Sequence, residues 1–173
     1  MYDPTIFDNL KVALENQLYD LDTIEEQIEI RNRRDVMDFA VLSREFALRF
    51  ALRNHPEIDA EVLLRASVRD LAGEIMEDPN ANPACSLSLC FQKNVVDPAV
   101  ECAGIEQVME SIWEQDVELT QTIRYVYGEE NPGLMNSIEA AFKPRLTEDH
   151  MTELSLFLEH VLDTLHVLSR MQH

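Results

Sequence analysis

The chain has 173 residues, 46% of them hydrophobic, and a formal net charge of −19 at pH 7. A chain of this length buries roughly two-thirds of the surface that its unfolded form exposes, so we expect one globular domain over residues 1–173. The strong negative charge repels phosphate backbones and anionic membrane surfaces, which argues against nucleic-acid binding and against a peripheral-membrane role.

The sequence carries no signal for export or membrane insertion. The N-terminal stretch MYDPTIFDNL is acidic and lacks the basic region and apolar run of a signal peptide. No run of about 18 apolar residues follows, so we expect no membrane-spanning helix. Three cysteines, an odd number, are poor material for a disulfide framework. Together these features favour a cytoplasmic location.

Residues 8–32 fit both a strand and a helix. Leu10, Val12 and Leu14, and then Tyr19 and Leu21, alternate as in a bulged strand that pairs with IEIR, whereas a helical periodicity runs from Phe7 to Ile28. Because a sheet needs several partners, we predict the strand. Residues 36–53 leave the same choice open: REFALRFALR alternates like a strand, but alanine, leucine and arginine are good helix formers.

The remaining elements follow from apolar spacing and from helix-end signals. Pro56 suits a helix start, and Thr147 suits an N-cap because acids follow it in the first turn. Strands are predicted at residues 85–91 and 116–127. Helices are predicted at 57–77, 104–115, 132–142 and 147–171.

These elements predict an α+β fold. Its mainly antiparallel sheet of four or five strands is packed on one face by about three helices, at 57–77, 104–115 and 147–171. The alternative is an all-α bundle, which the helix-forming composition of residues 36–53 would tolerate.

The stretch ACSLSLCFQK raises the question of whether its cysteines form a site. On a strand, Cys85 shares the face of Leu87, Leu89 and Phe91, whereas Cys90 lies on the opposite face. The two cysteines are then roughly 16 Å apart, too far for a disulfide or for shared zinc ligation. We therefore expect Cys85 to act as a small buried hydrophobe. We also expect Trp113, the single tryptophan, to belong to the core.

Residues 97–118 contain seven acids and no base. Among these acids, Glu106, Glu110 and Glu114 recur every four residues opposite an apolar arc that includes Met109. The simplest interpretation is the solvated face of an amphipathic helix. The sharper alternative is a docking surface for a basic partner, because like charges at this spacing disfavour the helix.

Arg31, Arg33 and Arg34 form a basic island in this acidic chain. On a strand, Arg31 and Arg33 would share one face. They either pair with neighbouring carboxylates or bind an anionic ligand or a carboxylate-bearing partner. Near the C-terminus, Asp163 and His166 stand at i and i+3 and are weak candidates for half of a metal site, although the sequence shows no second half.

No H-E-x-x-H, G-x-S-x-G, Walker A or G-x-G-x-x-G motif occurs in the sequence. We therefore expect a cytoplasmic, non-enzymatic interaction or regulatory protein that binds another protein through a charged surface and has no cofactor. One alternative is a hydrolase or metal-dependent enzyme built from dispersed acids and histidines. Another is a homo-oligomer that forms through a sheet edge or through a spare apolar face of the last helix.

Overall fold

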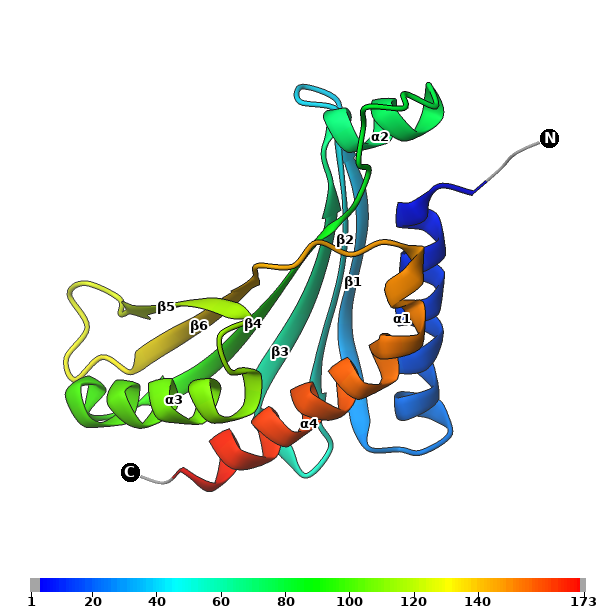
Figure 1. The fold of residues 1–173 in the computed structure, drawn as a ribbon. Coiled ribbons are helices and arrows are strands. Elements are labelled where there is room, and N and C mark those ends of the chain that lie inside the picture. The colour runs from blue at the N-terminus through cyan, green and yellow to red at the C-terminus, as the bar shows by residue number, and fades with distance from the viewer. Residues whose placement is uncertain (1–3, 172–173) are drawn as a thin grey trace.

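The structure is a computed structural model, and it describes residues 4–171. Within that range it contains four α-helices, six strands and one short 3-10 helix (Figure 1). In chain order these are α1 (Ile6–Thr23), β1 (Ile28–Asp38), β2 (Ser43–Leu52), β3 (His55–Ala66), α2 (Val68–Ile75), β4 (Ser86–Val95), α3 (Pro98–Trp113), β5 (Val117–Arg124), β6 (Leu134–Phe142), η1 (Glu148–Glu153) and α4 (Leu154–Arg170).

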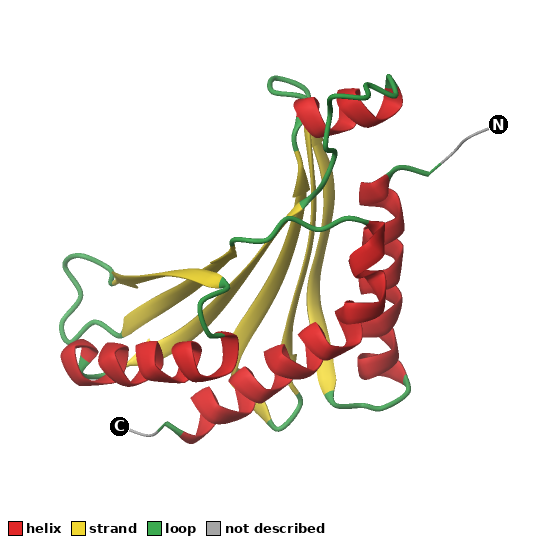
Figure 2. Ribbon diagram, in the orientation of Figure 1, coloured by secondary structure: helices red, strands yellow, loops and turns green. Residues whose placement is uncertain are grey.

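The strands form one antiparallel sheet in the order β1-β2-β3-β4-β6-β5. Helices α1, α3 and α4 lie on one face of this sheet, and α2 lies at the end of the strands near the β1–β2 turn (Figure 2). The α+β prediction is therefore confirmed and the all-α alternative is wrong. The sheet has six strands among the described residues, rather than the four or five expected.

Helix α1 replaces the strand that we predicted at the N-terminus. Thr5 and Asp8 form a capping box: the Thr5 hydroxyl accepts from the Asp8 N–H at 3.2 Å, and the Asp8 carboxylate accepts from the Thr5 N–H at 3.2 Å. The buried side chains recur at helical spacing, at Phe7, Leu10, Leu14 and Leu18. The strand prediction failed because the partner of β1 is β2 and not this segment.

The predicted helix at residues 57–77 is also wrong over most of its length. Residues 55–66 form β3, in which Ile58, Ala60, Val62 and Leu64 are buried at every second position. Only α2 is helical, and Ser67 caps it by accepting from the N–H of Asp70 at 3.2 Å. The apparent helical spacing arose because apolar residues of two consecutive elements were read as one pattern.

The predicted helix at 132–142 is strand β6, which lies between β4 and β5. Its inner face buries Asn136, Ile138 and Ala140 completely. The other predicted strands form, but with shifted ends: residues 28–32 of QIEIRN, 44–52 of REFALRFALR, 86–91 of the predicted 85–91 and 117–124 of the predicted 116–127 lie in strands. The predicted helix at 104–115 is α3, which begins earlier, at Pro98, and ends at Trp113. The predicted helix at 147–171 is η1 followed by α4.

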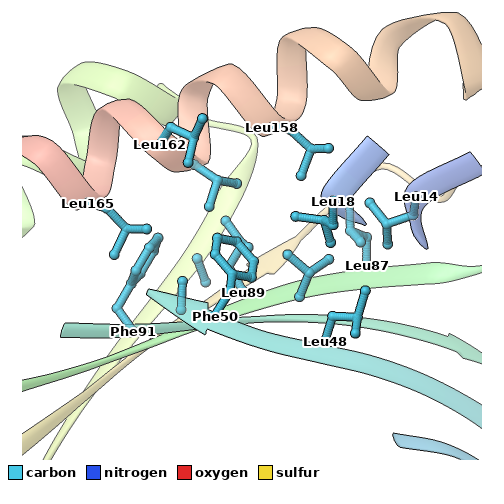
Figure 3. Packing of buried hydrophobic residues seen from close by; sticks show 14 of the residues in the cluster. Leu14, Leu18, Leu48, Phe50, Leu87, Leu89, Phe91, Leu158, Leu162 and Leu165 are labelled. Carbon is cyan, nitrogen blue, oxygen red and sulfur yellow. The ribbon is translucent and has the colours of Figure 1, made fainter. Parts of the chain in front are cut away.

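The core lies between the sheet and helices α1 and α4. Leu14 and Leu18 of α1 and Leu158, Leu162 and Leu165 of α4 meet side chains of β2 and β4 (Figure 3). Burial of each such side chain stabilises the fold by about 1.5–3 kcal/mol relative to an exposed one. This layer leaves α3 at the side of the molecule, over the β5–β6 end of the sheet (Figure 1).

Candidate functional site

Helix α3 holds its acidic residues on the outside because its opposite face is anchored in the core. Ile105, Met109 and Trp113 are buried at spacings of four residues. The intervening Glu106, Glu110 and Glu114 are exposed, as the sequence predicted. Within residues 4–171, none of these three glutamates forms an ion pair. They therefore form a charged stripe that the chain itself does not neutralise.

The stripe borders a groove of about 820 Å³ between α3 and β5, which we call the α3–β5 groove. Met109, Val117 and Leu119 supply its apolar surface, and Gln115 and Gln121 add uncharged polar groups. Among the described residues that line it, Lys143 is the one base, against Glu106, Glu110 and Glu114. The groove therefore combines apolar contact area with a strong negative charge. The sequence did not indicate that β5 would lie beside the acidic stripe.

Strand β5 forms one edge of the sheet, and within the described part of the chain it pairs with β6 alone. The Lys143 N–H donates to the Asp116 carbonyl at 2.9 Å, which identifies these residues as a hydrogen-bonded pair. In an antiparallel ladder such pairs alternate. The main-chain groups of Val117, Leu119 and Gln121 therefore point away from β6, toward the open edge.

The C-terminal end of α3 is fixed by its tryptophan. Trp113 is 6% exposed, and its indole N–H donates to the hydroxyl of Thr164 on α4 at 3.1 Å. Its ring packs against Phe142 and Phe157 with centroid separations of 5.2 and 5.7 Å. These contacts fix the C-terminal end of α3 against the core. The expectation that Trp113 belongs to the core is confirmed.

A buried polar cluster beneath the N-terminal end of α3 was not anticipated from the sequence. Lys93 is 5% exposed, and its ammonium lies 3.7 Å from the carboxylate of Glu101. The same carboxylate accepts from the N–H groups of Val96 and Asp97 at 2.6 and 2.7 Å. Glu101 thus turns inward and fixes the start of α3, so the acidic run of residues 97–118 is not one continuous surface.

The three arginines of the basic island each contact a carboxylate of the same chain. Arg31 pairs with Asp59 of β3, Arg33 with Glu15 of α1 at 2.6 Å, and Arg34 with Glu45 of β2 at 3.8 Å. The expectation that Arg31 and Arg33 share a face is wrong, because a register shift between Ile30 and Asn32 interrupts the alternation. Arg33 lies on the α1 side, and Arg31 reaches across to the other face.

Asp163 and His166 line a second groove, of about 580 Å³, between α1 and α4. Asp20, Glu25 and Glu159 also line it, so the fold adds acids that the sequence could not place there. However, no cluster of three or more His, Cys, Asp or Glu side chains with metal-binding geometry occurs among residues 4–171. The groove brings the two candidate residues beside other acids without assembling a metal site.

The cysteines do not form a shared site. Cys85 is 2% exposed, and burial raises the pKa of its thiol to about 12. Burial, together with Glu139 and Glu61, raises the pKa of Cys90, and burial with Glu101 raises that of Cys102. All three thiols are free. They are therefore poor nucleophiles, because the thiolate is the reactive form.

Comparison with protein-family models, curated protein sequences and solved structures finds no match to this chain. None of the helices among the described residues is both long and apolar enough to cross a membrane.

Proposed function

We propose that this protein is a cytoplasmic, non-enzymatic interaction protein, and that a basic segment of a partner protein binds in the α3–β5 groove. The observation that carries the proposal is the position of Glu106, Glu110 and Glu114. All three line a groove that also offers apolar contact area, and no base of the chain pairs with them within residues 4–171.

Two physical effects favour a basic occupant. First, a groove walled by protein concentrates the field of the charges that line it, so it attracts cations more strongly than scattered surface acids do. Second, like charges at i and i+4, such as Glu106 and Glu110, repel each other and cost the helix a few tenths of a kcal/mol. Glu114 adds a third acid at the C-cap of the same helix. A partner's Lys or Arg residues relieve this repulsion on binding, which adds to the direct attraction.

The arginine island offers a weaker alternative surface. Arg31, Arg33 and Arg34 already contact Asp59, Glu15 and Glu45, so an acidic partner would have to compete with these internal carboxylates. A basic partner in the α3–β5 groove displaces no internal ion partner of the three glutamates, and for this reason we favour the groove.

The experiment is affinity capture from a native lysate at low ionic strength, with the full chain as bait. The test bait carries Glu106→Gln, Glu110→Gln and Glu114→Gln, and the matched control carries Asp20→Asn, Glu159→Gln and Asp163→Asn. Both triple variants change the net charge equally, and the control changes the α1–α4 groove instead.

We expect the control bait to capture the same proteins as the intact chain. The Glu106/Glu110/Glu114→Gln bait should fail to capture them. Elution should occur as salt is raised, because screening weakens contacts between exposed charges. Equal capture by both variants, or capture of nothing at low salt, would contradict the proposal.

A further inference from the structure

The outer edge of β5 presents a row of unused main-chain hydrogen-bonding groups along the α3–β5 groove. The alternation fixed by the Lys143–Asp116 pair directs the N–H and C=O groups of Val117, Leu119, Gln121 and Ile123 outward. No hydrogen bond from another described residue reaches these main-chain groups from the outer side. Such an edge is a template for one more strand.

The acidic stripe follows the direction of this edge. Glu114 and Gln115 lie at the end of α3 that leads into Val117, while Glu106 lines the groove together with Gln121 further along β5. Helix α3 and strand β5 therefore run antiparallel to one another (Figure 1), and the stripe lines the same groove as Val117, Leu119 and Gln121 of β5. A strand added to β5 would extend along the whole stripe.

The repeat distances of the two elements match. Residues four apart on an α-helix are separated by about 6 Å along its axis, which sets the spacing of Glu106 and Glu110. Glu114 is the C-cap residue that follows α3, and its φ of 54° takes its side chain out of the helical repeat. Side chains on one face of a strand recur at roughly 6.6–6.8 Å. Alternate side chains of an added strand can therefore approach Glu106 and Glu110 in register, and Glu114 lines the same groove at the end of α3.

The side chains of β5 show what the two faces of an added strand would meet. On the groove side lie Val117, Leu119 and Gln121, with the acids of α3 beyond them. On the other side lie the exposed Glu118, Thr120 and Thr122. The groove side thus favours long, basic side chains whose alkyl stems cover apolar surface. The opposite side is polar and carries a single acid among these three residues.

We propose that the occupant of the α3–β5 groove binds by strand addition to β5, as an extended segment with Lys or Arg at every second position. This inference rests on the proposed function, because it names the kind of partner segment and the way it binds. Main-chain hydrogen bonds to β5 supply affinity, and the alternate basic residues supply specificity.

The test uses the full-length protein and synthetic seven-residue peptides, with fluorescence anisotropy to measure affinity. The first peptide alternates Lys and Thr (KTKTKTK), and a second has the same composition in blocks (KKKKTTT). Two further versions of the alternating peptide carry two N-methyl groups each. In one, these groups block the main-chain edge that pairs with β5; in the other, they block the opposite edge.

We expect the alternating peptide to bind at least tenfold more tightly than the block peptide. N-methylation of one edge should weaken binding at least tenfold and N-methylation of the other should have little effect. Removing two hydrogen bonds accounts for a change of this size. The Glu106/Glu110/Glu114→Gln variant should lose the preference for alternation, whereas the Asp20/Glu159/Asp163 control variant should keep it.

Hydrogen exchange locates the contact. The bound peptide should protect the amides of Val117, Leu119, Gln121 and Ile123, whereas the amides at 118, 120, 122 and 124, already paired with β6, serve as internal controls. Equal affinity for the alternating and block peptides, or unchanged exchange in β5, would overturn strand addition. If the peptides bind equally well but the Glu106/Glu110/Glu114→Gln variant binds neither of them, strand addition is wrong and the proposed function is retained. Absence of binding by any peptide also overturns strand addition, and lysate capture then decides the proposed function separately.

Discussion

Arg145 holds Asp70 in a two-pronged ion pair, with its Nη1 and Nη2 atoms 3.0 and 2.7 Å from the two carboxylate oxygens. Arg145 also donates to the carbonyl of Ala84 at 3.0 Å. Asp70 in turn accepts from the hydroxyl of Ser67 at 2.7 Å and completes the cap of α2. One carboxylate therefore joins α2, the segment before β4 and the segment that leads to η1.

We predict that the Asp70 carboxylate makes the free energy of unfolding fall in acid. Burial raises the pKa of Asp70, but the hydrogen bonds from Arg145 and Ser67 outweigh burial and lower it to about 2, from an ordinary 3.8. Because the folded-state pKa lies below the unfolded-state value, the contribution is fully present above pH 4. It is lost as pH falls from about 4 to 2. A shift of this size corresponds to about 2 kcal/mol.

The check is urea unfolding of the intact protein and of Asp70→Asn between pH 2 and pH 7. The variant should be less stable by about 2 kcal/mol at pH 7, and the difference should shrink toward pH 2. Asp163→Asn, at an exposed position of α4, is the control and should change little at any pH. A difference for Asp70→Asn that does not depend on pH would refute the electrostatic account.

The buried hydrogen bond between Trp113 and Thr164 predicts a stability cost for a nearly isosteric change. Thr164→Val leaves the indole N–H without its acceptor in the core, which should cost about 1–3 kcal/mol. Thr120→Val, at an exposed position of β5, is the control. Chemical unfolding followed by fluorescence of the single tryptophan measures both variants. A cost for Thr164→Val no larger than that of the control would show that the bond contributes nothing.

The raised thiol pKa values predict slow reaction of the native cysteines. At pH 8 we expect Cys85 to react with a thiol reagent only after unfolding, since burial raises its pKa to about 12. Cys90 and Cys102 should react more slowly than glutathione. The measurement is the rate of labelling at pH 7–9, with single Cys→Ser variants to assign each phase. Rapid labelling of native Cys85 would mean that its bridge to Leu146, just before β4, opens easily.

The acidic stripe predicts a gain of stability when its charge is removed. The Glu106/Glu110/Glu114→Gln variant removes the i, i+4 repulsion between Glu106 and Glu110 within α3, and it should be more stable than the intact protein by roughly 0.2–0.5 kcal/mol. The difference should decrease at 1 M salt, where charges are screened within about 3 Å. Thermal unfolding at low and high salt measures this effect. A destabilised variant would show that the glutamates stabilise the fold, which would contradict their assignment as a binding surface.

The local pattern was informative wherever an element has one clearly buried stripe. Helix α3 could be predicted because Ile105, Met109 and Trp113 recur at helical spacing, and the exposed positions of Glu106 and Glu110 follow from the same spacing. The same pattern failed at β3, where alternation and helical spacing overlap. It also failed at β6, whose buried Asn136 and Ala140 give no strong strand signal.

The groove could be predicted only in part. The acids were visible in the sequence, but their neighbours Val117 and Leu119 come from a different element, and Lys143 from a third. Alternation in β5 indicated that these side chains share a face. It could not indicate that this face meets α3, because that depends on where β6 inserts into the sheet.

The sequence by itself determined the negative charge and the inward-facing residues of α3, α4 and β4, because these follow from composition and from periodicity within one element. It favoured an α+β fold but left an all-α bundle open, because residues 36–53 fit both a strand and a helix. Only the tertiary structure decided that residues 6–23 are a helix, that β6 separates β4 from β5, and that β5 is left as an edge beside the acidic stripe. The physical reason is that strand pairing is a contact between segments distant in sequence. Periodicity reports which face of a segment is buried, but not which segment buries it.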